Sequence, residues 1–174
     1  WGIPYFEGSF YGIEDMSQSL RQIARLLVQQ GAEPDLQQRT ERLIEVEEAR
    51  AWKRIAPYRQ RLAGKRALLI TGGVKSWSVV AALTEAGIEV VGTSVKKSTP
   101  NDKEKIREIM GDDSHMIDAM TPRQMYDLLR DAKADIMLSG GRSQFVALKA
   151  RMPWLDINQE RNHPYGGYDC LLYT

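Results

Sequence analysis

The chain has 174 residues, of which 43% are hydrophobic and 27% are charged, and its formal net charge is +1. This balance is typical of a globular protein with one core, or with one domain and an appendage. The near-neutral charge excludes a global attraction to nucleic acid or anionic lipid, and no apolar run approaches the roughly 18–20 residues of a membrane span.

The cysteine and histidine counts restrict the chemistry further. The sequence contains one cysteine, Cys170, and two histidines, His115 and His163. A disulfide framework is excluded, as is a zinc or iron–sulfur site held by this chain alone. Such a composition is typical of a reducing compartment, so we expect a cytoplasmic protein. Residues 2–6 read like the end of a strand whose partners lie upstream, so we also expect a piece of a longer protein.

Residues 1–64 are predicted to be mainly helical. Asp15 or Ser17 is the candidate N-cap of a first helix that ends at Gly31. A longer, heavily charged second helix follows, and Pro57 should kink or break it. The apolar positions expected on the buried faces are Leu20, Ile23, Ala24 and Leu27, then Leu43, Ala51, Ile55, Tyr58 and Leu62. The charges are interpreted as a solvated face, with a partner surface as the alternative.

After Gly64 the pattern changes to strands that alternate with helices. The expected strands are residues 66–71, 88–93, 116–118, 136–139 and 154–157. The expected helices are residues 76–86, 101–110, 122–131 and 143–150. Thr121 should cap the third of these helices, with Pro122 at its favoured first position. The alternation predicts an α/β fold with a parallel sheet covered by helices on both faces.

The loops that follow these strands collect glycines and cations. In a parallel sheet such loops meet at the carboxyl edge, where ligands bind. Their special residues are Gly72, Gly73 and Lys75, then Lys96 and Lys97, then Gly140 and Arg142, and finally Asn158, Arg161 and His163. Paired glycines let backbone N–H groups approach a ligand at a helix N-terminus. In a nearly neutral chain, this concentration of cations predicts a site for an anion.

The residues alone do not identify the anion. A tight strand-to-helix turn needs glycine even without a ligand, and Lys75 follows Val74 where a phosphate loop requires glycine. No Gly-x-Gly-x-x-Gly motif is present, although Lys96 and its neighbour could hold a 2′-phosphate. For His163 the alternative is a loop residue without a ligand, and Cys170 is interpreted as structural. The residues therefore predict an α/β domain with an anionic ligand.

Five stretches, taken in order, resemble one known family. They are "WGIPYFEGSFYGIEDMSQSLRQIARLL", "GKRALLITGGVKSWSVVAAL", "VGTSVKKST", "DIMLSGGRSQFVALKARMPWLDINQER" and "HPYGGY". Together they are similar to the nitrogenase component 1 family, and within it to the scaffold members on which the nitrogenase iron–molybdenum cofactor is matured. The resemblance covers essentially the whole chain apart from the stretch "GYDCLLYT" at its end.

The resemblance implies a fragment of a protein with three Rossmann-like domains. Residues 1–64 would be the end of the middle domain and its helical connection, and residues 65–174 most of the third domain. In the catalytic α chain of the family, the cofactor lies between these domains. Its contacts in the matching loops carry over onto Gly72, Gly73, Lys75, Gly140 and Arg142, and we place Lys96 and His163 on the same rim.

The loop after the last strand of that catalytic chain supplies a histidine ligand to molybdenum. Asn158 is its counterpart in this sequence. A neutral imidazole is a good ligand for such metals and a carboxamide is a poor one. The resemblance therefore implies a loop that faces the cluster but has lost a strong ligand, as suits a protein that holds its cargo and then releases it.

The implied function is that of a scaffold, without turnover of its own, that binds and matures the cofactor precursor. This cargo is an iron–sulfur cluster with molybdenum and homocitrate, and the permanent iron–sulfur cluster of the full protein would be ligated outside this chain. The implied partners are the N chain of the scaffold in a heterotetramer, the nitrogenase iron protein, the precursor donor protein and apo-nitrogenase, with no nucleic acid and no membrane. Two alternatives stay open: a nitrogen-reducing nitrogenase α chain, and a nucleotide-binding Rossmann domain.

Overall fold

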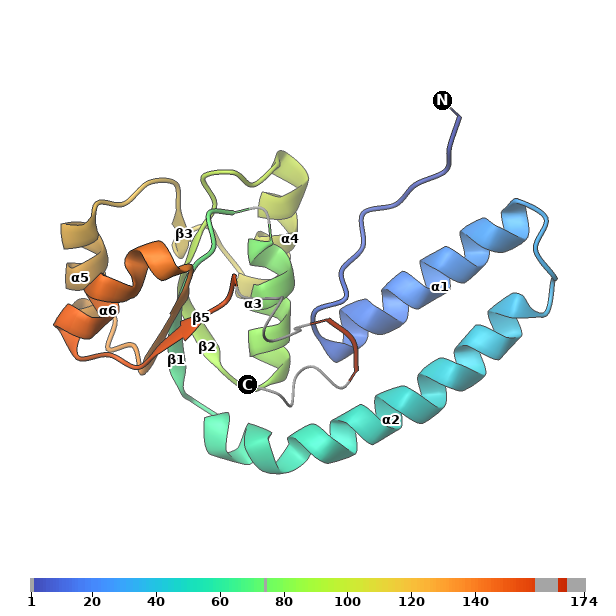
Figure 1. The fold of residues 1–174 in the computed structure, drawn as a ribbon, viewed down its shortest axis with the longest axis horizontal. Coiled ribbons are helices and arrows are strands. Elements are labelled where there is room, and N and C mark those ends of the chain that lie inside the picture. Colours follow the sequence, from blue (N-terminus) through green and yellow to red (C-terminus); the bar gives the residue numbers. More distant parts are fainter. Residues whose placement is uncertain (1, 74, 159–165, 169–174) are drawn as a thin grey trace.

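The computed structural model describes residues 2–73, 75–158 and 166–168. Within them, a five-stranded parallel sheet carries helices on both faces, and two long helices lie beside it (Figure 1). The strands are β1 (Arg66–Ile70), β2 (Glu89–Ser94), β3 (Met116–Ile117), β4 (Ile136–Ser139) and β5 (Trp154–Asp156). The helices are α1 (Ile13–Gln29), α2 (Leu36–Leu62), α3 (Ser76–Glu85), α4 (Pro100–Met110), α5 (Pro122–Asp131) and α6 (Gln144–Ala150), with a short 3-10 helix η1 (Gly141–Ser143) before α6.

The strand order β3-β2-β1-β4-β5 confirms the predicted α/β fold with a Rossmann-like parallel sheet. Each neighbouring pair of strands is parallel. The chain builds outward from β1 to β3 and then crosses back to place β4 on the other side of β1. In sheets of this kind the crevice at the crossover lies outside the carboxyl ends of the two central strands, which are β1 and β4 here.

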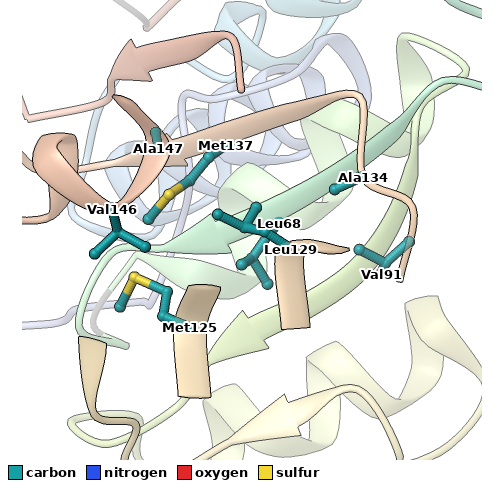
Figure 2. Packing of buried hydrophobic residues seen from close by; sticks show 8 residues of the cluster. All are labelled: Leu68, Val91, Met125, Leu129, Ala134, Met137, Val146 and Ala147. Carbon is teal, nitrogen blue, oxygen red and sulfur yellow. The ribbon is translucent and has the colours of Figure 1, made fainter. Parts of the chain in front are cut away.

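The central strand β1 divides its side chains between two apolar layers. Leu68 faces the layer beneath α5 and α6, where Met125, Leu129 and Val146 pack against it (Figure 2). Residues on either side of Leu68 along β1 face the opposite layer, beneath α3. Successive strand residues point to opposite faces, so a strand covered on both sides is apolar throughout. The three middle residues of β1 are therefore all buried because β1 is the central strand of the sheet.

The two long helices pack against each other and against the end of α3. The buried members of this third cluster are Ile13, Ala51, Ile55, Ala86 and Tyr168. A polar contact lies among them, because the Ser17 hydroxyl is 2.7 Å from the Tyr168 hydroxyl and donates to the Glu48 carboxylate at 2.8 Å. Tyr168 thus attaches the described C-terminal residues to the helical pair rather than to the sheet.

The start of α1 differs from its prediction. Neither Asp15 nor Ser17 is the N-cap. The helix begins at Ile13, and its N-cap residue is Gly12, which has no side chain to bond the first turn. The carboxylate of Glu85, at the end of α3, accepts hydrogen bonds from the backbone N–H groups of the first turn instead. A distant side chain has taken the role that a local cap usually has.

The buried face of α2 also differs from its prediction. Ile44 is 1% exposed, whereas Leu43 and Tyr58 are 52% and 48% exposed. Ile44, Ala51 and Ile55 lie on one stripe, and Leu43 is rotated about 100° from it, because each helical residue turns by that angle. Leu27, in the last turn of α1, is likewise 49% exposed.

Pro57 does not break α2, which continues to Leu62. Its exposed position lets the ring project away from the packed side of the helix. The start of α5 agrees with its prediction: the Thr121 side chain accepts from the Gln124 N–H, the Gln124 side chain accepts from the Thr121 N–H, and Pro122 occupies the first turn.

Candidate functional site

The loop between β1 and α3 is shaped by two glycines in the left-handed region, with φ of +85° at Gly72 and +117° at Gly73. A Cβ on Gly73 would lie 2.7 Å from the backbone nitrogens of Lys97 and Ser98, so only glycine fits there. The Lys97 N–H donates to the Gly72 carbonyl and the Ser98 hydroxyl to the Gly73 carbonyl, both at 2.9 Å. The loops that follow β1 and β2 are therefore in direct backbone contact.

Ser94, the last residue of β2, holds the same loop from beneath. Its buried hydroxyl accepts from the backbone N–H of Thr71 at 3.0 Å and of Gly72 at 2.9 Å. The Ser76 hydroxyl donates to the Ser94 carbonyl at 2.6 Å. The Gly72 N–H is thus satisfied by a hydrogen bond within the protein.

Lys75 connects three parts of the chain at the carboxyl edge. It precedes α3 and is half-buried. Its Nζ donates a hydrogen bond of 3.1 Å to the carbonyl of Ile157, just after β5, and lies 6.0 Å from the centre of the Tyr11 ring. The ammonium group therefore already holds the loop after β5, and its charge lies beside the N-terminal segment that leads into α1.

Asn158 lies against the loop that follows β4. A Cβ built on Gly140 would collide with the Asn158 carboxamide, so the two loops are packed at this point. The Asn158 backbone N–H donates to Asp156 Oδ1 at 2.9 Å, which closes the turn after β5. Asp156, not Asn158, is the residue whose side chain bonds the turn backbone, in the manner typical of aspartate.

Arg142 and Lys96 supply exposed cations on these loops. Arg142 lies in η1, and Lys96 lies two residues after β2. Among residues 2–73, 75–158 and 166–168, neither side chain takes part in an ion pair. Both charges face solvent at the edge where the crossover crevice opens.

The structure therefore brings most of the predicted residues together in two contacts between neighbouring loops. Gly72 and Gly73 pack on the loop of Lys96, and Lys75 and Gly140 both touch the loop of Asn158. Arg142 follows Gly140 by two residues. His163 lies outside the described residues.

Sequence reasoning missed Ser94 and Asp156. Each has a local signal in the sequence. Ser94 is a small hydroxyl residue at the end of a strand, and Asp156 lies two residues before a backbone N–H in the turn after β5, where aspartate often accepts a hydrogen bond. Tyr11, whose ring approaches Lys75, had none, since the two residues are far apart in the sequence.

Two surface cavities lie between other side chains of the chain. One of about 340 Å³ lies between the N-terminal segment, α1 and α4, and is lined by Asp15, Trp77 and Lys105 among others. The second, of about 360 Å³, lies between α5 and α6. Neither contains a predicted site residue. In the described part of the chain, no group of three or more His, Cys, Asp or Glu side chains could hold a metal ion.

The strongest change in a carboxyl pKa is that of Asp15. Burial raises the pKa of Asp15 to about 6, with further contributions from the nearby charges of Glu85 and Glu14. One Asp15 carboxylate oxygen, Oδ2, is buried without a hydrogen-bond partner among the described residues. Burial also raises the pKa of Glu85, although its two backbone hydrogen bonds oppose the shift.

Comparison with known proteins identifies the family. The sequence model for the nitrogenase component 1 type oxidoreductases matches residues 1–174. The chain belongs to the nitrogenase component 1 family. The fold agrees: a solved nitrogenase Cp1 structure at pH 5 superposes with a TM-score of 0.81 over 98% of this chain and 40% of that chain, at 22% identity. A second, at pH 6.5, has a TM-score of 0.80 at 21% identity and covers 43% of that chain.

Relatives within the nitrogenase component 1 family carry a more specific name. The chain is 72% identical to a protein of Bradyrhizobium diazoefficiens named nitrogenase iron-molybdenum cofactor biosynthesis protein NifE, over 99% of this chain and 31% of that protein. Proteins of the same name from Rhizobium meliloti and Klebsiella pneumoniae are 68% and 51% identical, again over 99% of this chain and over 36% and 37% of their own lengths. The resemblance to the scaffold members is confirmed. The chain spans about a third of the length of these relatives.

None of the helices in the described residues is both long and apolar enough to cross a bilayer.

Proposed function

We propose that this chain is part of a scaffold protein that binds and matures the precursor of the nitrogenase iron–molybdenum cofactor. The observation that carries the proposal is the carboxyl edge of the sheet, where exposed Arg142 and Lys96 lie on loops packed around Asn158 and Lys75. The names of relatives up to 72% identical favour this role over that of a nitrogen-reducing α chain or a nucleotide-binding domain.

The cargo suits the charge and chemistry of that edge. An iron–sulfur cluster with molybdenum and homocitrate is an anion, and the cations of Lys75, Lys96 and Arg142 offer charge-assisted hydrogen bonds to it. Asn158 offers a carboxamide where the catalytic chains of the family place an imidazole. A weaker metal ligand lets the cargo leave the scaffold.

The chain would contribute two parts to the whole protein. Residues 1–64 would be the end of the middle domain and its helical connection, and residues 65–174 would be most of the third domain. This division is supported by the placement of α1 and α2 beside the sheet (Figure 1), where their apolar cluster joins them to Ala86 and Tyr168 of the second part. Lys75, which reaches both Tyr11 and Ile157, lies where these parts meet.

The whole scaffold would work with other proteins. We infer a heterotetramer with the N chain, and exchange with the precursor donor protein, the nitrogenase iron protein and apo-nitrogenase. The permanent iron–sulfur cluster of the scaffold would be ligated outside this chain, which has a single cysteine. Nitrogen reduction by the loaded complex, or tight binding of a dinucleotide, would favour one of the two alternatives instead.

Asn158→His in the full-length scaffold tests the proposal. An imidazole is a stronger donor to these metals than a carboxamide, so the variant should keep its cluster longer. The measurement is the rate of transfer from loaded scaffold to cofactor-free nitrogenase, with the metal content of the scaffold measured in parallel. Slower transfer with equal or greater metal retention supports the proposal. Transfer at the wild-type rate with an unaltered cluster spectrum contradicts it.

A further inference from the structure

Gly140 and Asn158 share one small space at the carboxyl edge. Gly140 directly follows β4, and Asn158 lies in the turn that follows β5. The parallel pairing of these two strands places Ser139 beside Asp156. The space that a Cβ on Gly140 would need is filled by the Asn158 carboxamide. The clash involves the far end of the side chain, because the Asn158 Cβ itself would be 3.9 Å away, an ordinary contact distance.

Backbone conformation does not explain the glycine at this position. Gly140 has φ −74° and ψ 160°, an extended conformation that any residue adopts. Gly72 and Gly73, by contrast, have positive φ and need glycine for their backbone. Space for the neighbouring carboxamide is therefore the physical requirement that the structure attaches to Gly140.

The backbone that carries Asn158 is held from two other directions. Its own N–H donates to Asp156 Oδ1 at 2.9 Å, and the preceding carbonyl, of Ile157, accepts from Lys75 Nζ at 3.1 Å. Ile157 is buried at 4% exposure, so the backbone before Asn158 is also anchored by packing. Among residues 2–73, 75–158 and 166–168, the Asn158 carboxamide itself makes no hydrogen bond that would hold it. The carboxamide lies in the space that a side chain on Gly140 would occupy.

We propose that Gly140 is a positioning residue for Asn158: its missing side chain admits the carboxamide to the gap between the loops and so sets the direction in which this weak ligand is offered to the cargo. The effect on the cargo rests on the proposed function, whereas the contact between Gly140 and Asn158 rests on the structure alone. Any side chain at position 140 would rotate the carboxamide out of the gap while leaving the strands in place. Gly140 thus acts on the cluster through the position of the Asn158 side chain.

The neighbouring glycine provides a matched control. A Cβ on Gly141 would meet only Asp156 Oδ2, at 3.4 Å, an ordinary van der Waals contact, and its φ is not in the left-handed region. Gly141→Ala therefore adds the same methyl group one residue away without entering the space of Asn158. The informative set in the full-length scaffold is Gly140→Ala, Asn158→Ala, the double variant and Gly141→Ala.

The midpoint of thermal unfolding, measured without cargo, tests the contact. Gly140→Ala should lower the midpoint more, relative to its background, when Asn158 is present than when it is replaced by alanine, because only the carboxamide has to rotate out of the gap. In the Asn158→Ala background the same change should have little effect, since the clashing carboxamide is gone. Gly141→Ala should stay close to wild type. An equal loss from Gly140→Ala in both backgrounds would overturn the proposal.

The electron paramagnetic resonance spectrum and metal content of the loaded scaffold test the consequence for the cargo. Gly140→Ala should change the cluster spectrum and lower retention in the same direction as Asn158→Ala, and the double variant should match Asn158→Ala. A cluster spectrum that changes with Asn158→Ala but not with Gly140→Ala would overturn the positioning role. Thermal coupling with a wild-type spectrum in every variant would instead contradict the proposed function, because the carboxamide would then not face cargo.

Discussion

The Glu85 carboxylate accepts a hydrogen bond of 2.6 Å from the backbone N–H of Ile13 and so caps a helix that begins 72 residues earlier in the chain. Its other oxygen accepts from the Glu14 N–H at 2.9 Å. A negative charge at this end also complements the helix dipole of α1. The contact attaches the helical segment to the sheet domain through α3, next to the buried cluster around Ile13 and Ala86.

Glu85→Ala should lower the free energy of unfolding by about 0.5–2 kcal/mol, the usual cost of losing a helix cap. The loss arises because two N–H groups of the first turn of α1 lose their acceptor. Urea unfolding monitored by circular dichroism measures it. Glu108→Ala, at an exposed position of α4, is the matched control and should be nearly neutral. Equal effects of the two substitutions would mean that the Glu85 cap contributes nothing specific.

Asp15 should make the folded state less stable as pH rises. Its pKa is about 6 when folded and near the ordinary 3.8 when unfolded, so the folded state binds more protons between these values. Its contribution is therefore most favourable below about pH 4 and is lost as pH rises through about 6. Asp15→Asn should raise the free energy of unfolding at pH 7.5 by about 1–2 kcal/mol, a value reduced for solvent screening of a partly exposed group.

The measurement for Asp15 is the difference in unfolding free energy between the variant and the wild type from pH 4 to pH 8. Taking the difference cancels the contribution of acids whose pKa is lowered, such as Asp135, which make the folded state more stable as pH rises. The difference should grow across the window from about pH 4 to pH 6. A difference that does not change with pH would show that the carboxyl of Asp15 titrates normally.

Gly73 and Gly72 should differ in their tolerance of a methyl group. Gly73→Ala should cost about 2–4 kcal/mol of stability, because it combines an unfavourable φ with a collision against the backbone of the β2 loop. Gly72→Ala should cost only about 1–2 kcal/mol, since its φ is positive but nothing lies within 4 Å of the added carbon. Denaturant unfolding of both variants compares them. The reverse order of stability would contradict the described loop packing.

The elements that follow from local signals were predictable from the sequence. The strands of the sheet appear as short apolar runs separated by amphipathic helices. The cap of α5 involves only Thr121, Pro122 and Gln124, so it can be read from a few neighbouring residues. The positions of the carboxyl-edge loops follow from the parallel sheet itself. The sequence alone therefore places Gly72, Lys75, Gly140 and Asn158 on one edge.

What failed or was missed depends on contacts between distant residues. The Glu85 cap joins residues 72 apart, and the Ser17–Tyr168 contact joins residues 151 apart, so no local pattern indicates either. The prediction that Leu43 lies on the buried face of α2 was wrong, because near-helical spacing in a strongly charged helix fitted Leu43, whereas Ile44 is the residue that is buried. Partners in three dimensions decide these cases.

The central claim is that the exposed cations at the carboxyl edge hold an anionic cargo. Lys96 and Arg142 test it better than Lys75, whose ammonium group also supports the backbone at Ile157. Each charge-assisted contact to the cargo should be worth about 1.5–3 kcal/mol, or roughly a tenfold change in affinity or more. The matched control is the pair Lys53 and Arg61, which are exposed cations of α2.

The decisive measurement is the iron and molybdenum content of full-length scaffold after gel filtration, for the double variant Lys96→Gln with Arg142→Gln. The account predicts that this variant loses most of its cargo while its circular dichroism spectrum stays that of the wild type, and that Lys53→Gln with Arg61→Gln keeps its cargo. Wild-type metal content in the Lys96 and Arg142 double variant would contradict the account.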